Sequence, residues 1–131
     1  MKKLVLAGML ASSLVMGAEF SKAEQVITMQ SLESAMGMMQ KAFLRDNVAM
    51  MQIGVQSLKE NLNNIHNFVI KPSVMNEGFD PKAYAGKEVT NLNKIADEIL
   101  ADFEGDKKAD ARAKYDTALS QCIACHKIIR K

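Results

Sequence analysis

Two cysteines and a histidine near the C-terminus are the residues of this 131-residue chain best suited to chemistry. They form the pattern C-x-x-C-H, as Cys122, Cys125 and His126. Thiols three residues apart lie on one side of a helical turn, where each can add across a vinyl group of a haem. The histidine that follows is a usual ligand of haem iron. The motif therefore predicts one covalently attached haem c, with Cys122 and Cys125 as its thioethers and His126 on the iron.

Three other uses of the two cysteines fit the sequence less well. A thiol–disulfide redox pair normally opens a helix, where the helix dipole lowers a thiol pKa, but this pair lies near the end of its predicted helix. A zinc site would need a second pair, and the chain has two cysteines in all. A disulfide between residues three apart in a helix is geometrically awkward.

Four helices are predicted to position this motif. Apolar residues recur at spacings of three and four in four segments, which is the period of a helix with one buried face. Breaks fall at 45–47, where Asp46 or Asn47 can cap the next helix, at 72–80, a predicted loop, and at 104–106. Asp80-Pro81 is a plausible cap followed by a first-turn proline. No segment alternates like a strand, so we expect an all-α, antiparallel up-down-up-down four-helix bundle. The predicted core stripes are Met29, Leu32, Met36, Met39 and Phe43; Val48, Met51, Val55, Leu58, Leu62, Ile65 and Val69; Val89, Leu92, Ile95, Ile99 and Phe103; and Tyr115, Leu119, Cys122, His126 and Ile129.

The first 23 residues have the pattern of a secretory signal peptide. A basic start precedes an apolar run over 4–16, which is too short to cross a bilayer comfortably. Cleavage can follow Gly17, Ala18 or Ala23, and the last of these has the small-x-small form that the peptidase prefers. The remaining residues, 24–131, form one domain with equal numbers of basic and acidic side chains. We expect a periplasmic protein with no stable membrane insertion and no nucleic-acid partner.

A single C-x-x-C-H close to the C-terminus of an exported, all-helical chain resembles the class II c-type cytochromes, the cytochrome c′ family. The resemblance extends from about residue 25 to residue 131. It includes the Gly105-Asp106 break before the last helix and a basic residue, Arg130, four positions after the histidine. The family usually has an arginine near the start of the first helix that pairs with a haem propionate. This chain departs from the family there, with Leu32, Glu33 and Ser34.

The resemblance implies that the first helix faces the other side of the iron. A methionine there gives a six-coordinate electron carrier, and a residue that does not ligate leaves five-coordinate iron. Met38 is the first choice, because it falls off the core stripe beside the small residues Ser31, Ala35 and Ala42. Met36, on the core stripe, is the second choice. Met38 can equally be an adaptable surface methionine.

Further residues are predicted at the haem end of the bundle. His66, at the end of the second helix, is an outside candidate for the iron, or a half-buried histidine bonded to solvent or a propionate. Lys127, Arg130 and Lys131 follow the motif. Positively charged side chains stabilise a helix C-terminus whatever the function of the protein. Here they can also pair with haem propionates or bind an acidic redox partner.

Three functions follow from these expectations. The first is a mono-haem cytochrome, not an enzyme, that carries single electrons between redox partner proteins in the periplasm. The second is a five-coordinate haem module that binds NO or CO. The third is a haem-free structural or assembly bundle. The resemblance also implies a homodimer through the first two helices, since members of that family often pair there. Met50 and Ile53 of the second helix lie off its core stripe, and the net charge is near zero. These two side chains can equally be incidental surface residues or lie under the predicted 72–80 loop.

Overall fold

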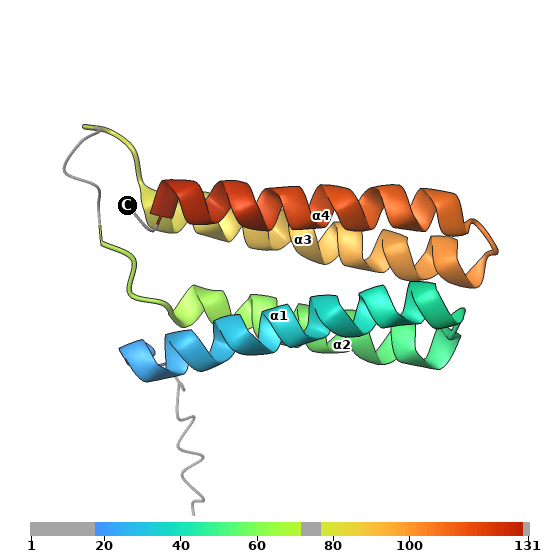
Figure 1. The fold of residues 1–131 in the computed structure, drawn as a ribbon. Coiled ribbons are helices and arrows are strands. Elements are labelled where there is room, and N and C mark those ends of the chain that lie inside the picture. Colours follow the sequence, from blue (N-terminus) through green and yellow to red (C-terminus); the bar gives the residue numbers. More distant parts are fainter. Residues whose placement is uncertain (1–17, 72–76, 130–131) are drawn as a thin grey trace, which may run out of the picture.

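The computed structural model describes residues 18–71 and 77–129, in which all regular structure is helical. Helix α1 packs along α2, α2 along α3, and α3 along α4, whereas α1 and α4 have few close backbone approaches within the described residues. Figure 1 shows two helical hairpins that lie closer together at their turns than at the opposite end. The predicted all-α, antiparallel four-helix bundle is confirmed. The elements are α1 (Lys22–Arg45), α2 (Val48–Asn64), the 3-10 turn η1 (Ile65–Asn67), α3 (Pro81–Glu104) and α4 (Lys108–Ile129).

Two of the predicted helix starts are confirmed by their caps. The Asn47 side chain accepts a hydrogen bond from the main-chain N–H of Met50 and caps α2. Asp46 instead ends α1 in a left-handed conformation, with φ of 49°. Asp80 caps α3 by accepting from two main-chain N–H groups, with Pro81 in the first turn. Each cap satisfies donors that a helix start would otherwise leave unpaired.

Helix α1 begins earlier than the apolar stripe indicated, because Ser21 and Glu24 form a capping box. The preceding residue also belongs to the fold: the Phe20 ring lies 6.2 Å from the Phe68 ring. A chain cut after Ala23 would lose both features, whereas a cut after Gly17 or Ala18 would keep them. Residues 1–17 of the predicted signal peptide lie outside the described residues.

Helix α2 ends earlier than predicted. The stripe was expected to continue to Val69, but α2 stops at Asn64 and is followed by one 3-10 turn. The backbone is extended at Phe68, whose side chain is 5% exposed, while Val69 is 45% exposed. Phe68 is therefore the buried residue after α2, whereas the apolar period of the sequence predicted that Val69 would be buried.

The main apolar core lies between the two hairpins and takes residues from all four helices. α1 and α2 approach closely at Gly54, where an added Cβ would lie 2.7 Å from Cγ of Met39. Within the described residues, no helix combines the length and the apolar character that a bilayer span requires. The buried apolar residues of the main cluster are Ala35, Met36, Met39, Ala42, Met51, Val55, Leu58, Leu62, Val89, Leu92, Ala96, Ile99, Phe103, Ala111, Tyr115 and Ala118.

Candidate functional site

The motif occupies the last two turns of α4, at the end of the bundle away from the two short turns (Figure 1). Cys122, Cys125 and His126 are all half-buried, whereas the intervening Ile123 is 49% exposed. Cys122 packs against the main apolar cluster. The three groups that the sequence predicted to act together therefore share the inner side of one helix end.

Burial raises the pKa of both thiols, and the carboxylate of Glu88 on α3 raises the pKa of each further. Both therefore remain protonated near neutral pH. A catalytic C-x-x-C pair needs the opposite, a thiol pKa lowered by a helix N-terminus or a nearby cation. The electrostatics of this helix end disfavour a thiol–disulfide redox site, as the position of the motif in its helix had indicated.

Helix α3 contributes two residues that sequence reasoning missed. Glu88 influences both thiols, and Tyr84, one turn earlier, has a pKa raised by burial and then by the charges of Glu88 and Cys125. They are four residues apart and so lie on one flank of α3, beside the buried stripe. A polar pair at this spacing on a half-buried flank is the signal that could have identified them.

The second half of α4 is less buried than predicted. Buried residues occur in α4 as far as Ala118, and none of its described residues after that is buried. Leu119, predicted in the core stripe, is 42% exposed, and Ile123 and Ile128 are 49% and 42% exposed. The apolar surface of this helix end adjoins the two thiols and the imidazole. Two thiols, one imidazole and an apolar flank are the groups that would hold a haem c, so the residues present fit that cofactor.

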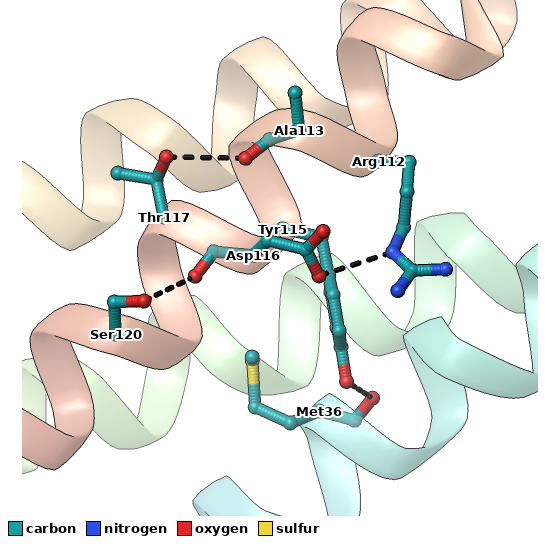
Figure 2. Close-up of polar contacts among 7 residues, drawn as sticks. All are labelled: Met36, Arg112, Ala113, Tyr115, Asp116, Thr117 and Ser120. Atoms are coloured by element: carbon teal, nitrogen blue, oxygen red, sulfur yellow. Dashed lines mark hydrogen bonds and ion pairs between the residues drawn. The ribbon is translucent and has the colours of Figure 1, made fainter.

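The two methionines proposed for the opposite side of the iron lie in different surroundings. Met36 is 8% exposed, and its main-chain carbonyl accepts a hydrogen bond of 3.1 Å from the hydroxyl of Tyr115 on α4 (Figure 2). Met38 is 36% exposed. Residues two apart in a helix point about 200° apart, so Met38 faces away from the side of α1 that meets α4. Of the two, the structure brings the second choice toward α4.

His66 is exposed, not half-buried as predicted. It lies in η1, and its Cε1 atom is 3.9 Å from the position that a Cβ on Gly86 would take. Gly86 and Glu88 point about 200° apart on α3, so His66 and the thiols lie on different sides of that helix. Lys127 is exposed in the last turn of α4, and the predicted basic residues 130 and 131 lie outside the described residues.

Leu32, Glu33 and Ser34 stand where the resemblance would place an arginine, and all three lie on α1. Leu32 packs against the core, and Glu33 and Ser34 are exposed.

In the part of the chain that the structure describes, no group of three or more His, Cys, Asp or Glu side chains is placed to hold a metal ion.

Comparisons with protein-family models, with curated proteins and with solved structures found no significant match to this chain.

Proposed function

We propose that this chain is a periplasmic mono-haem c-type cytochrome of the class II kind, which carries single electrons between redox partner proteins. The observation that supports it most strongly is the placement of Cys122, Cys125 and His126 together on the half-buried side of the last two turns of α4. Protonated thiols beside exposed apolar side chains suit covalent haem attachment better than thiol redox chemistry. When bound, the haem supplies a one-electron iron couple.

The chain's own residues would hold and insulate this group. Cys122 and Cys125 would fix it to α4, and His126 would bind the iron from the same helix. Glu88 and Tyr84 of α3 lie near enough to the thiols for their charges to act on one another's pKa values. Buried side chains between the hairpins exclude water, which lowers the local dielectric and stabilises the less charged state of the iron.

Met36 is the sixth ligand in this proposal, in preference to Met38. The preference rests on the buried position of Met36 at the contact with α4 and on the exposure of Met38. A thioether opposite a histidine raises the reduction potential, as in other methionine-ligated cytochromes c.

Haem attachment is tested first, by expressing the full chain in a host that attaches haem c. We expect haem to stay with the protein on a denaturing gel and the intact mass to increase by one haem. The Cys122→Ala and Cys125→Ala variants would each keep one thioether, and the double variant would keep none. If the unaltered chain carries no haem under these conditions, the haem-free bundle becomes the better explanation.

Axial ligation is tested on the haem-loaded protein with Met36→Leu and, as a matched control, Met38→Leu. Leucine conserves volume closely, so the substitution removes the thioether with little change in packing. We expect Met36→Leu to abolish the sulfur-to-iron charge-transfer band of the ferric form and to give high-spin iron, and Met38→Leu to change neither. A high-spin unaltered protein that binds CO would favour the five-coordinate gas-binding alternative.

The location and the partners belong to the same proposal. Fractionation of cells should recover the protein from the periplasm without residues 1–17 or 1–18, because the capping box at Ser21 belongs to the folded domain. The exposed Lys127 next to the motif offers a positive charge to an acidic redox partner. A homodimer through α1 and α2 remains part of the proposal, since Ile53 is 58% exposed.

A further inference from the structure

One polar contact joins α4 to α1 in the interior of the bundle. The hydroxyl of Tyr115 donates to the main-chain carbonyl of Met36 over 3.1 Å, and this contact is buried. Tyr115 precedes Cys122 by seven residues, or nearly two full helical turns, so the two lie on the same face of α4. The contact therefore connects the helix face that carries the motif to the α1 residue proposed as sixth ligand.

Other hydroxyls of this stretch of α4 bond within their own helix. Figure 2 shows Thr117 donating to the carbonyl of Ala113 and Ser120 donating to the carbonyl of Asp116, in each case one turn back. The side chain of Asp116 pairs with Arg112, again along α4. Among the contacts drawn there, the bond from Tyr115 alone crosses to α1.

The position of Tyr115 is itself restrained. Its ring packs edge-on against Phe43 of α1, with centroids 5.7 Å apart and planes at 72°. Its side chain is 8% exposed, like that of Met36. Because α1 and α4 have few close backbone approaches within the described residues, side-chain contacts set the register of one helix against the other. The bond from Tyr115 is one of these contacts, together with the Phe43–Tyr115 ring pair and the ion pair of Lys108 with Asp46. Of these three contacts, the bond from Tyr115 is the one made to Met36.

We propose that Tyr115 is a positioning residue for the sixth coordination site: it holds Met36 of α1 in register with the helix that carries His126. This inference rests on the proposed ligation by Met36. A ligand must be held within about 0.5 Å of its productive position by supporting contacts. Without the hydroxyl, α1 can shift along α4, and the thioether then spends more time away from the iron.

The experiment compares CO binding to the ferrous, haem-loaded full chain with and without the hydroxyl. Tyr115→Phe keeps the ring packed, and helix geometry leaves the carbonyl of Met36 bonded to the N–H four residues ahead, so the fold is expected to persist. Carbon monoxide binds where the thioether has left, so its apparent affinity is proportional to the unligated fraction. Loss of one hydrogen bond should raise that affinity about two- to twelvefold.

Thr117→Ala and Ser120→Ala are the matched controls, because each removes a hydroxyl of α4 whose bond stays within that helix. Both should bind CO as the unaltered protein does. Failure of the two proposals can be told apart. If Met36→Leu leaves CO affinity unchanged, ligation by Met36 is wrong. If Met36→Leu raises the affinity and Tyr115→Phe does not, ligation stands and the positioning role is wrong.

Hydrogen exchange gives a second readout that does not depend on the iron. In the haem-loaded Tyr115→Phe variant, amide exchange should accelerate in α1 around Met36 and remain unchanged in α3. An equal acceleration in all four helices, with CO affinity unchanged, would mean that Tyr115 contributes only to global stability, and would overturn the inference.

Discussion

The two ends of the bundle are built differently. At the end where the hairpins turn, Phe43 packs edge-on against both Phe103 and Tyr115, at 5.3 and 5.7 Å between centroids. Lys108, at the start of α4, pairs with Asp46, which ends α1. The rings come from three helices, so aromatic packing joins these helices at this end, while Leu44 and Val48 beside the α1–α2 turn remain 80% and 41% exposed.

At the opposite end the same helices are less well covered. Beyond Ala118, α4 exposes Leu119, Ile123 and Ile128 by more than two fifths each, although they are large and apolar. A helix that buries Ala111, Tyr115 and Ala118 in its first half and exposes large apolar residues in its second half is matched to two different neighbours. We infer that the turn end folds on its own side chains and that the motif end is shaped for the proposed cofactor.

Removing both cysteines should have the largest effect, and it should destabilise the motif end more than the turn end. In Cys122→Ala/Cys125→Ala we expect loss of haem and a large loss of unfolding free energy, because a domain of this size loses with the cofactor a large part of the apolar contacts at its motif end. Exchange protection should disappear from the second half of α4 before the turn end. A double variant as stable as the unaltered protein would show that both ends are self-sufficient.

Shortening a side chain of the turn-end cluster should destabilise the protein without releasing the haem. Phe103 is 1% exposed, and Phe103→Ala should cost about 3 to 5 kcal/mol because it leaves a cavity under Phe43. The haem content should stay as it was, because the change lies far from the motif along α3 and α4. Chemical unfolding and the haem content of the same sample would check this. A loss of haem would mean that attachment at the motif depends on the packing of the turn end.

Local signals of the sequence predicted the fold well, and long-range contacts limited the rest. The caps at Asn47 and Asp80 were predictable because a cap depends on residues within one turn. The end of α2 was not, because Phe68 leaves the helix to meet Phe20, nearly fifty residues earlier. For the site, the motif was predictable from spacing. The contact of Met36 with α4 was not, because a helical wheel does not show which side of α1 faces α4.

Tyr115 belongs to the turn-end cluster and also reaches α1, so its titration probes the boundary between the two regions. Burial raises its pKa, and the charges of Asp116 and Cys122 raise it further, against the opposing charge of Arg112. The folded state therefore keeps the phenolic proton at pH values where the unfolded chain, with a tyrosine pKa of about 10, has lost it. The contribution of the Tyr115 phenol to the free energy of unfolding is therefore fully present below pH 10 and is lost as the pH rises above that value.

Tyr115→Phe should accordingly cost about 1 kcal/mol at pH 7, from the lost hydrogen bond to Met36. That difference should shrink above pH 10, because only the tyrosine form loses stability there. Urea unfolding of both proteins at pH 7, 9 and 11 measures it. Tyr84→Phe is the control for the other tyrosine with a raised pKa. A difference that stays constant with pH would show that Tyr115 does not titrate with unfolding.

The smallest expected effect on stability concerns an exposed apolar residue of α2. Ile53 is 58% exposed, whereas Met50, one turn earlier and predicted off the core stripe, is half-buried and packs against the core. If exposed apolar residues of α4 face a cofactor, those of α2 require another explanation, which we propose is a second copy of the chain. A two-fold pair would bury this patch against its own copy.

Ile53→Lys should change the stability of the monomer by less than about 0.5 kcal/mol, because the site is on the surface. It should nevertheless convert a dimer to a monomer, because each interface would contain two facing lysines. Light scattering of the haem-loaded protein over a wide concentration range measures this, with Asn91→Lys on the exposed side of α3 as a charge-matched control. If the unaltered protein is already monomeric throughout, the patch has no role in self-association.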